Sequence, residues 1–259
     1  MSHRLYARPP VEQAVFGLRF SDVLPYNPHR SSAIWISVSE VLGPTFSPGS
    51  FVQGPVINSD GTQGLIMLDR FTSADGRVTI DINPSAFVVH IKTPEHDFRG
   101  WDLEFAPYIE PLLNICQDIE SLGNKEATSV EVRYVNTLDL PNDEHALQDF
   151  VQIQVGPPNL VAAIGEFTHT ATLFQESSGC VVRLNTALTQ SGQEGKSRFL
   201  SEVTVTAHFD PTSQVREIMS HAGRVKALQR EVFEDIYTDL SRHIFEGGDP
   251  ATFSRQGSD

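Results

Sequence analysis

Apolar and polar positions alternate along most of the chain with the period of two that is typical of half-buried strands. In the first such run, residues 12–20, Phe16, Leu18 and Phe20 alternate with smaller or polar residues. Eight more strands are expected at 51–58, 63–72, 77–83, 86–93, 129–140, 166–176, 180–190 and 199–209. The short turns between these runs favour antiparallel pairing.

Other segments carry apolar residues every three or four positions, which places them on one face of a helix. This spacing predicts helices at 28–42, 98–122 and 144–153, and one of about eight turns from Val215 to just before Gly247. Pro107 and Pro111 each remove an internal hydrogen bond from the second helix, so a kink or a break with a restart is expected there.

Both halves of the chain run in the same order: a strand, a helix, antiparallel strands and a closing helix. Their first strands look alike, since Val15-Phe-Gly-Leu-Arg19-Phe20 corresponds to Ser129-Val-Glu-Val-Arg133-Tyr134. We therefore expect an α+β fold of two related antiparallel β-sheet units, each backed by helices. The first unit would span 1–125 and the second 126–247, followed by a flexible tail at 248–259. The alternative is that an α+β chain gives such a pattern by chance.

The composition favours a globular protein with a sizeable core, because 39% of the 259 residues are hydrophobic. The formal net charge of −14 and the pI of about 5.0 argue against a nucleic-acid-binding surface over the whole protein, although they leave room for a local basic patch. The first ten residues lack the apolar run of a signal peptide, and no stretch approaches a membrane span. We expect a cytoplasmic protein without membrane contact.

No motif for catalysis or for a cofactor stands in the sequence. None of the nine histidines has another at the spacing that one helix or strand needs for a metal site. A nucleophile elbow and a dinucleotide-binding glycine pattern are also missing. We expect no cofactor. The alternative is a metal-dependent hydrolase or nuclease whose site forms only in the fold, from residues such as Asp69, Asp81, Asp139, His90 and His208.

The more specific polar signal is Arg133-Tyr134-Val135-Asn136, with Arg19-Phe20 as its counterpart in the first half. An arginine beside an aromatic residue on a strand can present its donor fork to a carboxylate or a phosphate. Asn136 falls on the opposite face from Arg133 unless a bulge intervenes. Arg133 then either pairs with a buried acceptor and ties the halves together, or it binds a ligand or partner.

Three short motifs carry a resemblance to a known family: Arg8-Pro-Pro-Val-Glu-Gln-Ala14, Arg133-Tyr-Val-Asn136 with a following Leu-x-Leu-Pro, and Leu228-x-x-x-Val-Phe-x-x-Ile236. With them the chain resembles a sporadically distributed, uncharacterised family of bacterial proteins of similar length. Gln13 stands where that family commonly has an acidic residue. The resemblance implies an accessory bacterial protein linked to defence or toxin control, and it transfers no catalytic residue.

These observations favour a non-enzymatic binding or regulatory protein that acts through a protein partner or a small anionic ligand. The site is expected in a cleft between the two sheets, near Arg19, Arg133 and Asn136. A further alternative is a structural module that forms homo-oligomers through a sheet edge.

Overall fold

The computed structural model describes residues 6–21, 28–57, 63–83, 85–93, 96–118, 126–140, 147–152, 167–190 and 197–253. Its centre is one antiparallel sheet of nine strands, in the order β2-β3-β4-β5-β1-β6-β9-β8-β7. The strands are β1 (Val11–Phe20), β2 (Phe46–Ile57), β3 (Gln63–Ser73), β4 (Val78–Asn83), β5 (Ala86–Lys92), β6 (Ala127–Leu140), β7 (Phe167–Gln175), β8 (Cys180–Gln190) and β9 (Ser197–Thr212). The expected α+β class is confirmed.

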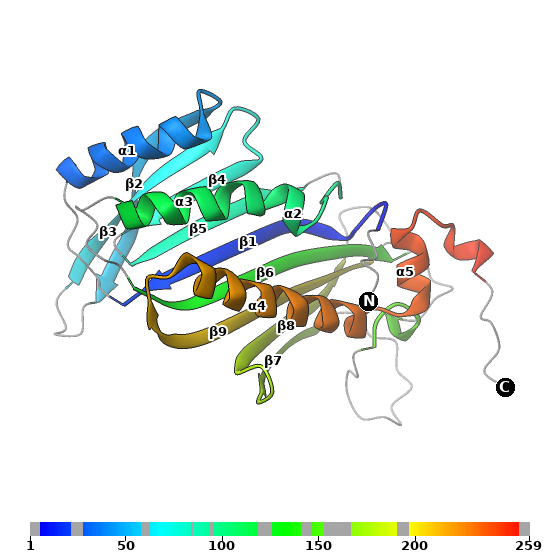
Figure 1. Cartoon of the computed structure of the whole chain (residues 1–259). Coiled ribbons are helices and arrows are strands. Elements are labelled where there is room, and N and C mark those ends of the chain that lie inside the picture. The colour runs from blue at the N-terminus through cyan, green and yellow to red at the C-terminus, as the bar shows by residue number, and fades with distance from the viewer. Residues whose placement is uncertain are drawn as a thin grey trace.

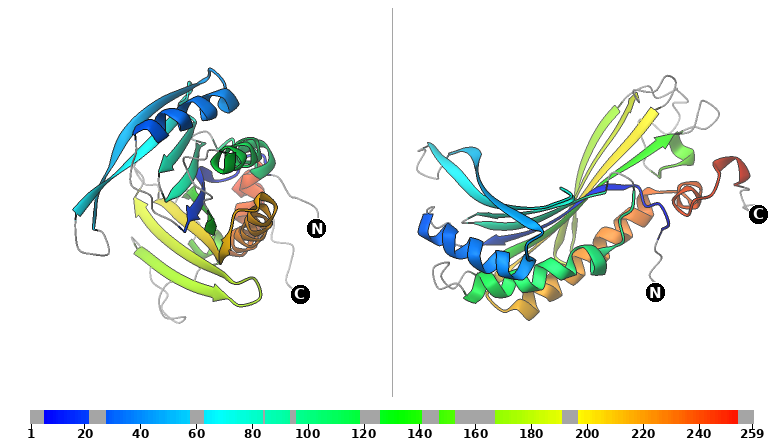
Figure 2. Two further views of the ribbon diagram at one scale, coloured as in Figure 1. Left: turned by 60° about the vertical axis from the view of Figure 1, so that its left-hand side comes forward. Right: turned by 90° about the horizontal axis from the view of Figure 1, so that it is seen from above.

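The helices lie on one face of this twisted sheet, and the other face carries none in the described ranges (Figures 1 and 2). They are α1 (Pro28–Leu42), α2 (Trp101–Glu104), α3 (Ala106–Asp118), α4 (Val215–Ile236) and α5 (Asp239–Phe245). Helix α4 contacts β6 and β9, while α1 contacts β2 and α3. No helix among the described residues combines the length and the apolar character that a membrane span requires.

The core lies between the sheet and this helical layer. The alternation of the strands directs Phe16 and Leu18 of β1 and Val132 of β6 into it, where all three are fully buried. Trp101 and Phe105 pack around Phe16, with ring centroids 5.6 and 6.5 Å from its centroid. Burial of these apolar side chains is the main force that holds helices and sheet together.

The two sheets expected from the sequence are a single sheet. Strands β1 and β6, the first strands of the two halves, pair with each other, with Val15 opposite Arg133 and Arg19 opposite Ser129. Pairing of this kind satisfies backbone groups that two separate sheets would leave exposed at their edges. The boundary between the halves is therefore a ladder of hydrogen bonds, and no cleft separates two sheets there.

The break predicted in the helix at 98–122 is confirmed. Helix α2 ends at Glu104, and α3 restarts at Ala106 with Pro107 in its first turn, where a missing N–H costs no helical bond. Asp97, the residue before the predicted start at Phe98, does not cap a helix there, since its carboxylate accepts from Arg77 Nη1 at 2.9 Å. The helix begins instead after Gly100, whose φ of 88° favours glycine.

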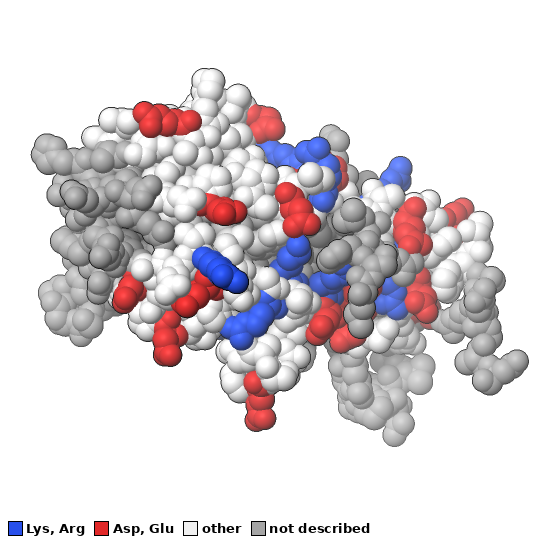
Figure 3. All heavy atoms as spheres, in the orientation of Figure 1, with Lys and Arg blue, Asp and Glu red and all other residues white. Residues whose placement is uncertain are grey.

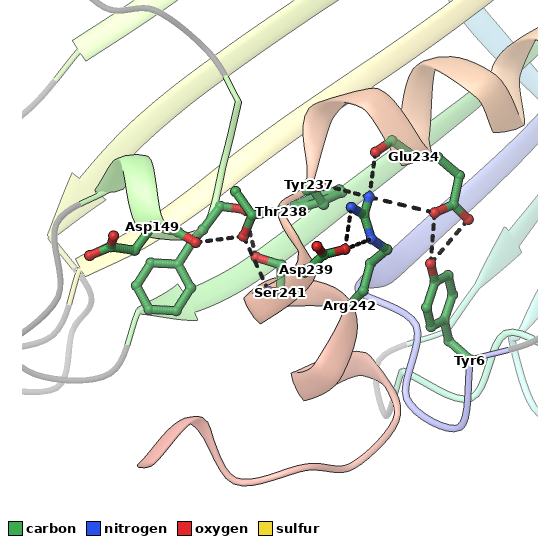
Figure 4. A network of polar contacts seen from close by, with 9 residues as sticks. Tyr6, Asp149, Glu234, Tyr237, Thr238, Asp239, Ser241 and Arg242 are labelled. Atoms are coloured by element: carbon green, nitrogen blue, oxygen red, sulfur yellow. Dashed lines mark hydrogen bonds and ion pairs between the residues drawn. The ribbon is translucent and has the colours of Figure 1, made fainter. Parts of the chain in front are cut away.

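The long last helix is broken where the sequence predicts a continuous one. Tyr237 is extended, with φ −102° and ψ 139°, and it forms an isolated β-bridge with Val151. Thr238 then caps α5, where its hydroxyl accepts from the backbone N–H of Ser241. Arg242 Nη1 donates to the carbonyls of Glu234 and Tyr237, 2.7 and 2.6 Å away (Figure 4). Contacts from outside α4, a distant one at Val151 and a downstream one at Arg242, therefore lie at its end.

Two expected segments lie partly outside the described residues. Of the helix predicted at 144–153, the described part forms only a 3₁₀ turn at Leu147–Asp149. In the predicted tail, Pro250–Thr252 forms another 3₁₀ turn, and the ring of Phe253 contacts His243 at a centroid distance of 5.5 Å.

Candidate functional site

The three residues predicted to form a binding site do not meet. Arg19 and Arg133 point to the helix-free face, four strand positions apart along the β1–β6 pair, which is about 13 Å. Asn136 points to the helical face, as a strand without a bulge at this point requires. The register of β1 and β6 therefore separates Arg19, Arg133 and Asn136, which we expected to lie together.

Arg133 takes part in a polar cluster on the helix-free face. Its Nη1 lies 3.7 Å from Glu202 Oε2 on β9, and Asn185 of β8 donates to Glu202 Oε1 at 2.9 Å. Arg133 Nε is buried without a hydrogen-bond partner among the described residues. The arginine thus contacts a carboxylate of its own half and does not link the two halves through this ion pair.

Asn136 is fully buried beneath the end of α4. Its Nδ2 donates to Ser201 Oγ at 3.2 Å, and that hydroxyl is hydrogen-bonded to Tyr237 OH at 2.9 Å. Burial raises the pKa of Tyr237 despite the bond from Ser201, so the phenol stays neutral. These contacts give Asn136 a structural position next to the break between α4 and α5.

The residues considered for a metal-dependent enzyme are also spread apart. Asp69 accepts from Trp35 Nε1 at 3.0 Å, and Asp139 pairs with Arg198 at 2.7 Å. Only Asp81 and His90 come together, 3.4 Å apart. Within the described parts of the chain, no group of three or more His, Cys, Asp or Glu side chains could hold a metal ion.

Asp81 belongs to an ion-pair cluster on the helix-free face. Arg70 Nε and Nη2 donate to its two carboxylate oxygens at 2.6 and 2.7 Å. Burial alone would raise the pKa of Asp81, but the bonds from Arg70 and His90 outweigh it and hold that pKa below its ordinary value. With both oxygens bound by an arginine, this carboxylate serves as a structural anion.

A hollow lies on the helical face, where both halves of the chain meet. It is a cavity of about 280 Å³, lined by Tyr6, Pro9, Val11, Phe98, Arg99, Gly100, Trp101, Asp102, Leu103, Tyr134, Lys226, Gln229, Arg230, Phe233 and Glu234. These residues come from the segment before β1, the start of α2, the middle of β6 and the second half of α4. We call this hollow the α2–α4 pocket.

One side of the α2–α4 pocket is built on α4. Gln229, Arg230 and Phe233 come three, four and seven residues after Lys226, so the four side chains lie on one strip of the helix. Trp101 faces them from α2, and Lys226 Nζ lies 5.6 Å from its ring centroid. Lys and Arg side chains gather on this face over α2 and α4 (Figure 3).

The far wall of the α2–α4 pocket joins the N-terminal segment to α4. Tyr6 OH donates to the Glu234 carboxylate at 2.8 and 3.0 Å, and Arg242 Nη1 lies 3.8 Å from the same carboxylate (Figure 4). Glu234 is thus held by two neighbours. Burial raises the pKa of Tyr134, so its phenol is neutral.

Comparison with known proteins adds no assignment: no protein-family model matches the chain, and no curated protein matches its sequence. The site is therefore argued from its residues alone.

Sequence reasoning missed the pocket-lining residues, although two signals pointed to them. Lys226 and Arg230 stand out as part of a basic stretch, which by itself is typical of a solvated helix face. The spacing of Gln229 and Phe233 places an amide and a ring beside these cations. The motif around Arg133 also contains a pocket residue, Tyr134, on the opposite face from the arginine.

Proposed function

We propose that this chain is a non-enzymatic binding or regulatory protein that responds to a small anionic ligand held in the α2–α4 pocket. Its place in the bacterial cytoplasm, in defence or toxin control, is part of the proposal and rests on the sequence and on the resemblance to the bacterial family. A ligand in this position would touch β1 and α2 of the first half and β6 and α4 of the second. Its binding would therefore couple the two halves.

The observation that carries this proposal is the charge of the pocket. Arg99, Lys226 and Arg230 line it, against two acids, Asp102 and Glu234, in a protein whose net charge is −14. The remaining lining is largely apolar and aromatic. Concave, mostly apolar sites with a few convergent polar groups are typical of small-molecule binding. An anion is the ligand that this local excess of cations favours.

A thermal-shift screen of small organic anions against the intact chain tests the proposal. We expect some anions to raise the melting temperature of the wild type but not that of Leu103→Trp. This substitution replaces a leucine of the pocket lining with a bulkier indole side chain. Ile36→Trp is the matched control, because Ile36 and Leu103 are 63% and 64% exposed and only Leu103 lines the pocket. Stabilisation that survives Leu103→Trp unchanged would contradict the proposed location.

Homo-oligomers formed through the β7 edge are the second candidate. No strand of the described residues pairs with the outer side of β7, which has no proline and no charged residue. Leu173 and Phe174 on it are 58% and 66% exposed, whereas the other edge strand, β2, contains Pro48 and Pro55. Natural edge strands usually carry charges or proline against edge-to-edge pairing. We expect a dimer by sedimentation velocity that Phe174→Lys dissociates and Ile36→Lys does not.

We also propose that the two halves derive from a duplication. Strands β1 and β6 lie side by side at the centre of the sheet, and each pairs with the last strand of its own half, β5 or β9. A helix follows that last strand in both halves, α3 in the first and α4 in the second. This shared order of pairing supports a common origin.

A further inference from the structure

Gln229 shows what kind of ligand the α2–α4 pocket would take. Its side chain lines the pocket and is 2% exposed, yet its Nε2 has no hydrogen-bond partner among the described residues. Buried polar groups in proteins are nearly always hydrogen-bonded, because an unpaired donor loses its water without compensation. Because Gln229 lines the pocket, a turn of its side chain would present this unpaired donor to a ligand that brings an acceptor.

Aromatic rings form the apolar part of the pocket. Trp101 is held between Phe16 and Phe105, with ring centroids 5.6 and 5.2 Å away, so its orientation is set by the core. Phe98 packs edge to face on Tyr134 at 5.3 Å. Rigid rings of this kind favour a flat apolar body, which packs against them by stacking or edge-to-face contact.

Two cations of the pocket, Lys226 and Arg99, form ion pairs that are partly exposed to water. Lys226 Nζ lies 3.2 Å from Asp102 Oδ1, but the Asp102 side chain is 83% exposed. Arg99 Nε lies 3.4 Å from Glu104, and the Arg99 side chain is 66% exposed. Ion pairs exposed to water contribute little. A carboxylate bound inside the pocket can therefore replace the partner of Lys226 at small cost.

The volume limits the size of the ligand. Ligand cavities commonly range from roughly 300 to 1,000 Å³, and the α2–α4 pocket lies at the small end with about 280 Å³. A body of one or two fused rings is in keeping with this space.

We propose, resting on the proposed function, that the α2–α4 pocket binds a flat aromatic carboxylate of one or two rings. Its ring contacts Trp101, its carboxylate lies near Lys226 and Arg230, and one acceptor oxygen receives the amide hydrogen of Gln229.

Two probes of nearly the same shape test this inference: anionic 2-naphthoate and its neutral analogue 2-naphthamide. Their dissociation constants are measured on the intact chain by saturation-transfer NMR. We expect naphthoate to bind at least roughly tenfold more tightly, since a hydrogen-bonded charge pair adds that much or more. Both probes carry an acceptor, so Gln229→Leu should weaken both by roughly tenfold.

The cations are tested with the double variant Lys226→Gln/Arg230→Gln. It should abolish the preference for naphthoate and leave naphthamide binding unchanged. Arg216→Gln is the control, because Arg216 lies on α4 outside the pocket lining. Circular dichroism and the melting temperature of each variant confirm that it is folded before binding is compared.

The outcomes separate this inference from the proposed function. Equal affinity for both probes, or naphthoate binding that neither Gln229→Leu nor the double variant weakens, overturns the aromatic carboxylate. If naphthoate fails to bind while another anion stabilises the wild type and not Leu103→Trp, the ligand class is wrong and the proposed function stands. If no anion is sensitive to Leu103→Trp, both are wrong.

Discussion

The two faces of the sheet treat their charged residues differently. On the helix-free face, Arg70 pairs with Asp81 and Arg133 with Glu202, each across neighbouring strands. On the helical face, the α2–α4 pocket contains a buried amide nitrogen without a partner among the described residues, beside Lys226, whose acidic partner Asp102 is 83% exposed. The charges of the first face thus pair across strands, while the unpaired amide of the second face lies in the lining of a pocket.

The register of the sheet explains this difference. Arg70 and Asp81 are directly opposite each other on β3 and β4, and Glu202 is a diagonal neighbour of Arg133. Side chains at such positions lie about 5–8 Å apart at their bases, so opposite charges there reach each other. The pocket has no such register, because its residues come from four separate segments. Arg133 Nε on the helix-free face and Gln229 Nε2 on the helical face both lack a partner among the described residues, but only Gln229 lines the pocket.

The largest expected effect is that of Trp101→Ala, which removes the ring shared by the core and the pocket. Trp101 is 8% exposed and packs against Phe16 and Phe105. Its loss should lower the free energy of unfolding by about 3 kcal/mol, as for other large-to-small core changes. Urea denaturation measures this. Leu103→Ala, an exposed neighbour in α2, is the control and should change it by less than about 0.5 kcal/mol. Equal effects would show that the floor of the pocket is not part of the core.

The next effect is that of Asp81→Asn on the paired face. The substitution removes the anion that Arg70 and His90 contact, and it should lower the free energy of unfolding by about 1–2 kcal/mol at neutral pH. This loss of stability is small for a buried carboxylate in an ion pair, because the Arg70 side chain is 36% exposed to water.

The same pair has a defined pH dependence. Because the pKa of Asp81 in the folded state lies below its ordinary value of about 3.9, its contribution is complete above that value. It disappears as the pH falls through the lower, folded-state pKa. The difference in unfolding free energy between wild type and Asp81→Asn should therefore shrink below about pH 4. A difference that stays constant down to about pH 2 would contradict this assignment.

The alternation in the sequence predicts which strand residues lie on the helix-free face, but it predicts little of how the helices are arranged on the other face. It places Arg133 and Asn136 on opposite sides of β6, and Pro107 predicts the break before α3. The apolar rhythm also runs through Tyr237 without interruption, so the end of α4 cannot be read from it. That end depends on Val151 and Arg242, which are distant or downstream in the chain.

Arg19, Arg133 and Asn136 do not meet in the structure for a similar reason. Similar motifs in β1 and β6 suggested two arginines facing a shared cleft, but the two strands are hydrogen-bonded neighbours. Which strands pair is decided by contacts across the whole chain, and no local pattern contains that information. Tyr134 is an example. The alternation of its strand predicts that it is buried on the helical face, but it does not predict which residues of other elements lie beside it in the pocket.

A smaller effect of opposite sign is expected for Gln229→Leu. The leucine removes a buried amide without a partner for its nitrogen, so the free energy of unfolding should rise by about 1 kcal/mol. Asn185→Leu on the helix-free face is the matched change, and it should lower the free energy because Asn185 donates to Glu202. Both are measured by urea denaturation at neutral pH. A loss of stability in Gln229→Leu would mean that the amide already has a stabilising role in the unliganded protein.

The smallest effect is expected for Arg19→Ala. The Arg19 side chain is exposed on the helix-free face and forms no ion pair with any described residue, so the free energy of unfolding should change by less than about 0.5 kcal/mol. Binding of 2-naphthoate should also be unchanged, because Arg19 lies on the opposite side of the sheet from the α2–α4 pocket. If Arg19→Ala abolished ligand binding while Lys226→Gln/Arg230→Gln did not, the ligand would bind the strand face that the sequence motif indicated. The unpaired amide of the pocket would then have no role in ligand binding.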